Sequence, residues 1–307
     1  MFKKIKTFII ITILLLCLLY SLINPKLIIS DIINATNIFL NNLFPSMFFF
    51  YTIGDLLVNY NFIKILELTL NKLFLKIFHI SATSSFIIII SMLSGFPSGS
   101  KYITNFVKEK RINRNIANYL LTFTHFSNPL FILGMISSIY NKKVAIIVLL
   151  IHYSSNFILA YLIRPKEVYK EQQIIKKERK SFDIALKESF NNSFRILLIV
   201  FGNTCFFYTF SDIVTLFINN NIIKTIIYGS FDLTKGIIFL NTINVSNYFK
   251  ILLILSFISF GGINVNFQVK QIISKEKLDY KYFLLGRISS LAISIILLFI
   301  CFTIGII

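Results

Sequence analysis

The chain has 307 residues, of which 56% are hydrophobic and only 14% are charged, and its formal net charge at pH 7 is +18. A soluble domain of this size needs many more charged side chains at its surface, so the composition excludes one. The long apolar runs also exclude a transmembrane β-barrel, which would show short alternating segments, and we expect an all-α polytopic membrane protein.

Apolar runs of about 20 residues, the length that crosses a bilayer, define the expected spans. In chain order these spans are 7–23, 38–58, 115–139, 143–163, 192–217, 249–273 and 283–305. The first run resembles a signal sequence, but no small-residue cleavage site follows it, so we expect an uncleaved anchor. Two further stretches, 80–108 and 222–243, are apolar but interrupted, which favours re-entrant hairpins.

The positions of the basic residues support this layout. With the N-terminus in the cytoplasm and both interrupted stretches re-entrant, 25 of the 31 Lys and Arg residues fall on the cytoplasmic side, including those of 101–114, 164–195 and 270–287. This positive-inside pattern accounts for the net charge without a nucleic-acid partner. The expected units are an N-terminal anchor with an external segment (1–37), a first repeat (38–163), a basic cytoplasmic linker (164–191) and a second repeat (192–307). A role of the linker in docking a partner or anionic lipid is the alternative to a plain connection.

The two halves of the chain share a motif. Phe49–Val58 ("FFYTIGDLLV") and Phe206–Thr215 ("FFYTFSDIVT") are identical at five of ten positions, including Asp55 and Asp212. In each half an interrupted stretch, a broken span and an uninterrupted span follow the motif in the same order. The expected topology runs the two copies in opposite directions, which predicts an inverted repeat of the kind common in secondary transporters. Chance similarity between Phe-rich segments is the alternative.

Polar groups inside a membrane are costly and usually functional, so the helix breaks supply the candidate ligand-binding residues. "SGFPSGSK" (Ser94–Lys101) stops a helix at mid-depth, where free backbone groups attract a ligand. In "THFSNPLF" (Thr124–Phe131) a proline breaks the next span. The candidates of the first half are Gly95, Pro97, Ser98, Gly99, Ser100, Thr124, His125, Ser127 and Asn128. The alternatives are a kink that only packs, a buried core histidine, and an asparagine that only caps a helix.

In the second half, "GSFDLTKG" places Asp232 and Thr234 at the hairpin tip. A buried carboxylate there either binds a ligand or pairs with Lys235. Gly261 and Gly262 permit the next span to unwind, and we expect an extended stretch after them, in which alternate side chains share one side. One wall of amides would then consist of Asn264, Asn266 and Gln268. Amides donate and accept hydrogen bonds, which suits a neutral polar solute.

Two polar stripes at helical spacing are expected to support the site. One stripe comprises His152, Ser155 and Asn156, and the other Thr204, Tyr208, Ser211, Asp212 and Thr215. Hydrogen bonds between helices are the favoured interpretation of both stripes, with ligand contacts as the alternative, and Asp55 and Asp212 are expected to have a structural role near the membrane interface. The sequence holds no metal-ligand spacing, catalytic motif or dinucleotide loop, so we expect no enzyme activity, metal or cofactor.

A family resemblance rests on these same motifs. The stretches "SGFPSGSKYITNFVKEKRI", "LLTFTHFSNPLFILG", "IHYSSNFILAYL", "SFDLTKG" and "SFGGINVNFQV" resemble the YlbJ-type sporulation integral membrane protein family, whose members carry a nucleoside-recognition (Gate) domain. The resemblance implies a multi-pass protein in the cell membrane of an endospore-forming bacterium, with a role in spore cortex formation. It also implies a fold similar to the core of concentrative nucleoside transporters, with two re-entrant hairpins, two broken spans and an interfacial helix, here Phe62–His79.

The sequence departs from the family pattern at two candidate positions. Asp232 stands where family members usually have Glu, Asn266 stands where they usually have His, and the chain is shorter than typical members. These differences concern the ligand rather than the fold. The resemblance implies transport or sensing of a small polar solute, with a coupling cation and a homo-oligomer as further expectations. A non-transporting scaffold in spore envelope assembly and a general nucleoside or ion transporter are the alternatives.

Overall fold

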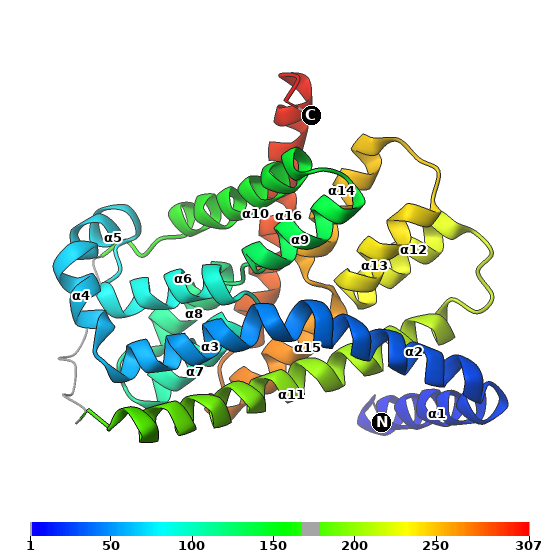
Figure 1. Ribbon diagram of the computed structural model, residues 1–307, viewed down its shortest axis with the longest axis horizontal. Coiled ribbons are helices and arrows are strands. Elements are labelled where there is room, and N and C mark those ends of the chain that lie inside the picture. Colours follow the sequence, from blue (N-terminus) through cyan, green and yellow to red (C-terminus); the bar gives the residue numbers. More distant parts are fainter. Residues whose placement is uncertain (1, 168–178, 307) are drawn as a thin grey trace.

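The computed structural model describes residues 2–167 and 179–306, and over these ranges it is helical without a strand (Figure 1). The first half contains α1 (Phe2–Ile23), α2 (Pro25–Ile38), the π-helical turn η1 (Phe39–Leu43), α3 (Phe44–Asn59), α4 (Phe62–Thr69), α5 (Asn71–Phe78), α6 (Ala82–Ser94), α7 (Ser98–Lys108), α8 (Arg114–Phe123), α9 (Pro129–Ile139) and α10 (Lys142–Leu162). The second half contains α11 (Phe182–Val214), α12 (Asn221–Phe231), α13 (Leu233–Phe239), η2 (Leu240–Thr242), α14 (Asn247–Phe260), α15 (Gly262–Ile273), η3 (Ser274–Glu276) and α16 (Tyr280–Thr303).

Six helical runs among the described residues are long and apolar enough to cross a membrane, which places the protein in a lipid bilayer. They are Lys4–Ile23, Pro25–Asn59, Lys142–Leu162, Phe182–Val214, Asn247–Glu276 and Tyr280–Thr303. The expected span 115–139 is divided into α8 and α9 by a break at 124–128, where the sequence predicts one.

Two helices begin earlier than expected. Pro25 occupies the first turn of α2, a position where its missing N–H is tolerated, and the helical path continues through η1 into α3. Most of the expected external segment is therefore helical. In the second half α11 begins at Phe182, inside the expected linker 164–191, because small side chains such as Ala185 and Ser189 are buried in its first turns. The middle of that linker, 168–178, lies outside the described residues.

Each interrupted stretch folds as a helical hairpin. In the first, α6 and α7 return side by side, so that the rings of Phe86 and Phe106 lie 6.0 Å apart. In the second, α12 and α13 pack so that the ring centroids of Tyr228 and Phe239 lie 4.5 Å apart. The two hairpins lie on opposite sides of α15 and α16 (Figure 1).

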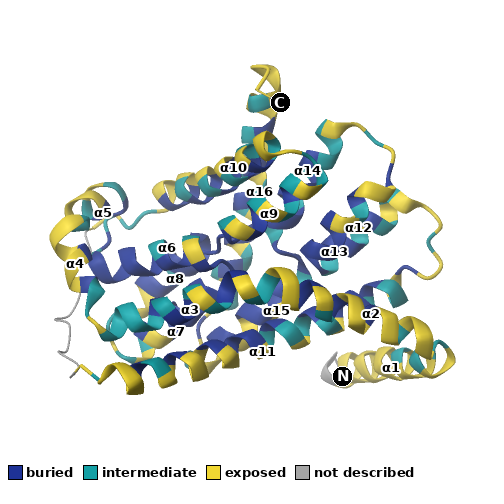
Figure 2. Cartoon of the chain, viewed as in Figure 1, coloured by how far each residue is buried: buried dark blue, intermediate teal, exposed yellow. Residues whose placement is uncertain are grey.

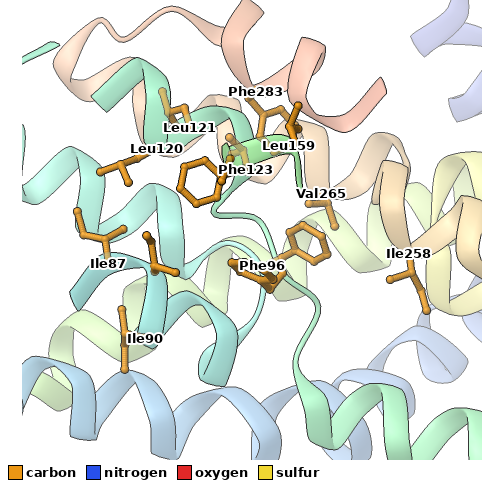
Figure 3. Close-up of a cluster of buried hydrophobic side chains, with 14 of the residues drawn as sticks. Ile87, Ile90, Phe96, Leu120, Leu121, Phe123, Leu159, Ile258, Val265 and Phe283 are labelled. Carbon is orange, nitrogen blue, oxygen red and sulfur yellow. The ribbon is translucent and has the colours of Figure 1, made fainter. Parts of the chain in front are cut away.

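The core lies where the hairpins and the broken spans meet. Buried residues concentrate at the centre of the molecule, whereas α1 is exposed along its length (Figure 2). One apolar cluster joins the two halves, and Figure 3 shows Phe96 from the first hairpin beside Val265 from α15 within it. Leu, Ile and Phe side chains exposed on the spans form the surface that faces lipid.

Candidate functional site

A buried arginine contacts both broken spans, α8–α9 and α14–α15. Arg287 of α16 is 0% exposed, and its guanidinium donates to the carbonyls of His125 (2.9 Å), Ser259 (3.3 Å) and Thr122 (3.4 Å) and to Oδ1 of Asn156 (2.8 Å). Thr122 lies in the last turn of α8, His125 lies in the break between α8 and α9, and Ser259 lies in the last turn of α14 before the break to α15. One guanidinium therefore satisfies carbonyls at both broken spans.

Two basic residues that the sequence places on the cytoplasmic side, Arg287 and Lys101, are buried inside the protein. We counted the basic residues of 270–287 and 101–114 as cytoplasmic, yet Arg287 is inside the core and Lys101 is 4% exposed. Each is buried because it has partners: backbone carbonyls for Arg287, and the carboxylate of Asp55 at 2.8 Å for Lys101. Sequence analysis could have found Arg287, since a charge within an apolar run marks a functional or structural centre.

Asn128 organises the first break. Its Oδ1 accepts from the backbone N–H groups of Leu130 (2.7 Å) and Phe131 (3.3 Å), which caps α9. Its Nδ2 donates to the carbonyls of Ser46 (2.8 Å) and Leu93 (3.0 Å). The protein thus uses both N–H groups and the oxygen of this amide, so the capping interpretation describes what the structure shows.

The other polar groups at this break also bind the protein. His152 Nε2 accepts from the backbone N–H of Ser127 at 3.0 Å, and Asn156 holds Arg287, so this stripe makes the expected hydrogen bonds between helices. Ser155 adds another bond, to Ser290 at 3.1 Å. His125 is fully buried, with its ring centroid 4.5 Å from that of Phe283, so it packs as a core histidine.

The first hairpin tip packs against backbone. Gly95 has φ +75° and approaches Asn128 so closely that a Cβ would lie 2.7 Å from its backbone nitrogen. Ser98 Oγ donates to the Gly95 carbonyl at 2.6 Å. Gly99 is equally constrained, since its Cβ would lie 2.3 Å from the carbonyl oxygen of Thr124. At this tip Phe96 lines the cavity between the two halves, which is described below. Its neighbours Pro97, Ser98, Gly99 and Ser100 do not line it.

At the second tip Asp232 caps α13. Its Oδ1 accepts from the N–H groups of Thr234 (2.9 Å) and Lys235 (3.0 Å), and its Oδ2 accepts from Nδ2 of Asn264 (2.6 Å). The alternative of an Asp232–Lys235 ion pair is wrong, because the Lys235 ammonium points to Asp212 and to the carbonyl of Tyr208 (2.9 Å). The partners of the Asp232 carboxyl group are therefore three N–H donors and not that cation.

The expected extended stretch after Gly261 is also wrong. Gly261 (φ +82°) and Gly262 (φ +65°) adopt left-handed conformations that glycine tolerates, and α15 resumes at Gly262 itself. Helical spacing leaves Asn264 and Gln268 on one face, where Gln268 Nε2 donates to Asn264 Oδ1 at 2.7 Å. Asn266 lies elsewhere: it donates to the Gly262 carbonyl (2.6 Å) and accepts from the hydroxyl of Tyr280 (2.5 Å). The wall contains two amides instead of three.

A cavity of about 40 Å³ lies where the two halves meet. The first half contributes Leu43, Ser46, Met47, Phe96, Ser127, Asn128 and Phe131, and the second half contributes Val200, Thr204, Asp232, Leu233, Thr234, Asn264, Val265 and Gln268. Thr204, expected only in a supporting stripe, reaches Asn264 Nδ2 at 3.2 Å and was missed as a wall residue. Oε1 of Gln268 is buried without a hydrogen-bond partner among the described residues, so the cavity wall carries an open acceptor.

Equivalent ion pairs stand behind the two hairpin tips. Asp55 pairs with Lys101 at 2.8 Å in the first half, and Asp212 pairs with Lys235 in the second. The tyrosine four residues before each aspartate lies against the lysine, with the ammonium 5.3 Å from the Tyr51 ring and 4.1 Å from the Tyr208 ring. In each half, the aspartate of the repeated motif therefore binds a lysine in the first turn of the helix that follows the hairpin tip, α7 or α13.

Comparison with known proteins gives one similarity. The chain is 22% identical over 286 residues to the sporulation integral membrane protein YlbJ of Bacillus subtilis (strain 168), a match that covers 80% of this chain and 70% of the relative. No family model matches the chain. No solved structure matches it either.

Proposed function

We propose that this chain is a sporulation membrane protein that binds a small, uncharged polar solute in the cavity between its two halves, in order to move or sense it. The observation that carries this proposal is the cavity wall, where Asp232, Asn264 and the open oxygen of Gln268 converge from two different elements. Buried polar groups with unused hydrogen-bonding capacity are costly, and a ligand would remove that cost.

The charges at the wall favour a neutral solute. Asp232 is already stabilised by two backbone N–H groups and the amide of Asn264, so it has little need of a cation. The other polar residues of the wall are amides and hydroxyl residues, which donate and accept without net charge: Ser46, Ser127, Asn128, Thr204, Thr234, Asn264 and Gln268. Hydroxyl and amide groups of a sugar, a nucleoside or a short peptide fit that chemistry.

The cavity's size implies a closed state. Its volume of about 40 Å³ exceeds the ~10–15 Å³ that one water molecule needs, but it is small beside the ~300–1,000 Å³ of pockets that hold a small solute. Any larger solute requires one hairpin tip to move. Gly95 and Gly261, where rigid helices meet and φ is positive, are the hinges that we propose for this movement, because glycine adopts such conformations more readily than other residues.

The proposed architecture is an inverted repeat similar to the core of concentrative nucleoside transporters. Its support is the pair of equivalent ion pairs, Asp55–Lys101 and Asp212–Lys235, each beside a tyrosine and each following a helical hairpin tip. We place the N-terminus in the cytoplasm on the positive-inside pattern. Similarity to the sporulation protein YlbJ supports sporulation as the setting. Spore cortex formation as the process served is carried over from the family resemblance of the sequence motifs alone.

A non-transporting scaffold is the second candidate. The observation that favours it is Asn128, whose amide is fully occupied by backbone groups of three different segments, as expected of a residue that only holds a fold together. The two candidates differ in one property, since a scaffold has no need for Gln268 to keep an open acceptor.

The test compares two glutamines of α15. Purified protein in detergent is screened by thermal shift against nucleosides and soluble precursors of the cortex, with wild type, Gln268→Leu and Gln271→Leu. Gln271 is exposed on the same helix and serves as the matched control. We expect a solute that stabilises wild type and Gln271→Leu but not Gln268→Leu. Failure of every solute, together with normal sporulation of cells carrying Gln268→Leu, would sink the solute proposal and leave the scaffold.

A further inference from the structure

A larger hollow adjoins the cavity between the two halves. It is a groove of about 650 Å³, formed by η1 and the start of α3, by α9, and by the end of α13 with η2. Two residues, Ser46 and Phe131, line both the groove and the cavity. A residue that lines two hollows lies between them, so the groove approaches the cavity at these two residues.

The walls of the groove indicate that it holds water rather than lipid. Asn41 and Asn42 of η1, Ser138 of α9 and Asn241 of η2 line it and are exposed, within a largely apolar part of the chain. Exposed amides are costly in hydrocarbon, which makes a lipid-filled groove unfavourable. None of the described residues that line the groove is charged. Its chemistry therefore suits the same neutral polar solutes as the cavity.

The π-helical turn η1 connects one wall of the groove to the cavity. Turns of this kind are rare and occur frequently at functional sites. The hydroxyl of Ser46 donates to the carbonyls of Asn42 (2.8 Å) and Leu43 (3.0 Å) in this turn, and the Ser46 carbonyl accepts from Asn128 Nδ2 at 2.8 Å. Ser46 is thus fixed on both sides by hydrogen bonds. Of the two shared residues, Phe131 is the one whose side chain is free to move.

We propose that the groove is the entrance for the solute and that the ring of Phe131 closes the passage from the groove to the cavity. Phe131 stands in the first turn of α9 and is only 5% exposed. Its backbone N–H is bound to Asn128, whereas its ring has no hydrogen-bonding group, so a change of rotamer breaks no hydrogen bond. What passes through rests on the proposed function. The water-filled groove and its closure by Phe131 do not.

The groove lies at helix ends that share one side of the membrane in the proposed orientation. Ser138 is in the last turn of α9, and Asn241 is in η2, just before the loop 243–246. With the N-terminus in the cytoplasm, both ends lie on the external side, away from the basic residues of 101–114. The proposed entrance therefore receives the solute from outside the cytoplasm.

Thiol labelling of the full chain tests the route without any solute. The three native cysteines are first replaced by serine: Cys17, Cys205 and Cys301. Single cysteines are then introduced in place of Met135 in the groove, Thr204 in the cavity, and Leu150. Leu150 is the lipid-facing control, since it is 59% exposed in the middle of the apolar helix α10.

Met135→Cys reports on the groove. In membrane vesicles of either orientation, it is treated with a charged methanethiosulfonate reagent that does not cross the bilayer. We expect modification from the external side only, because water in the groove admits the reagent and favours the reactive thiolate. Leu150→Cys should react from neither side, since its thiol lies in hydrocarbon.

Thr204→Cys reports on the passage. In detergent, the small neutral reagent methyl methanethiosulfonate should modify it slowly while Phe131 is present. If the closed passage opens about 0.1–10% of the time, Phe131→Ala should raise the rate about tenfold or more by leaving it open. Phe126→Ala is the matched control for a loosened fold, because Phe126 is fully buried in the same break but lines neither hollow. If Phe131→Ala does not fold, Phe131→Leu replaces it and should raise the rate less, in the same direction.

Three results would overturn the proposal. The first is a Met135→Cys thiol that reacts no faster than that of Leu150→Cys, and the second is modification of Met135→Cys from the cytoplasmic side only. The third is a rate at Thr204→Cys that Phe131→Ala and Phe126→Ala change equally. Labelling as expected in a protein that no solute stabilises would retain the closed passage and reject the proposed function, so the two failures are distinguishable.

Discussion

Replacing Arg287 by methionine tests whether one guanidinium holds both broken spans. Methionine has a similar length and leaves little void, so the change mainly removes the four hydrogen bonds that Arg287 donates. A hydrogen bond to a charged group contributes about 1.5–3 kcal/mol, and the two short bonds, to His125 and Asn156, therefore amount to about 3–6 kcal/mol. Release of the buried charge offsets part of this, so we expect a net loss of about 2–4 kcal/mol.

The assay is reversible unfolding in mixed detergent micelles, monitored by helical circular dichroism. Arg195→Met is the matched control, because Arg195 is exposed on α11 and its replacement should change little. Arg287→Lys retains the charge but not the planar fork that reaches acceptors on both sides, so it should lose most of the same free energy. The reasoning is refuted if Arg287→Met unfolds like Arg195→Met, or if Arg287→Lys restores wild-type stability.

Two further predictions concern packing and charge at the same centre. Gly286→Ala should destabilise the protein by about 1–3 kcal/mol or more, since the new Cβ would lie 1.8 Å from the Thr122 carbonyl oxygen. The control is Gly202→Ala, whose Cβ meets open space, so this variant should be neutral or stabilising. Equal midpoints of thermal unfolding for the two variants would contradict the prediction. Asp55→Leu should lower the free energy of unfolding by about 3–5 kcal/mol, because it leaves the Lys101 ammonium buried and unpaired. Adding Lys101→Met to this variant should recover most of that loss. Additive losses in the double variant would show that the two residues are not coupled.

The sequence predicted the breaks well because glycine and proline act locally. Gly95 and Gly261 each follow the end of a helix and Pro129 begins one, for reasons contained in one or two residues, and each break is found where it was expected. Asp232 was placed correctly at a tip, since a cap depends only on its own next turn. Local chemistry therefore located the elements that meet at the cavity.

Partners across the fold could not be predicted in this way. Lys235 is three residues from Asp232, which made that pair the natural choice, yet the side chain extends to Asp212 on α11 because the backbone N–H groups already satisfy Asp232. Asn266 was expected in the amide wall because a Gly-Gly pair permits unwinding. The break there takes only the two glycines with positive φ, and the helix that resumes at Gly262 turns the Asn266 amide away from Gln268.

The two halves contribute different chemistry to the proposed site. From the first half, the polar lining residue Asn128 has its amide fully engaged by backbone groups, so its exposed contribution is the apolar surface of Phe96 and Phe131. From the second half, Gln268 keeps an oxygen without a partner among the described residues, whereas the amide of Asn264 is bonded to Asp232, Thr204 and Gln268. A solute bound there would meet an apolar face on one side and the amide of Gln268 on the other. The proposed function therefore favours a solute with a flat apolar surface and polar groups along one edge over a fully hydroxylated one, and competition between such solutes for wild-type protein would separate them.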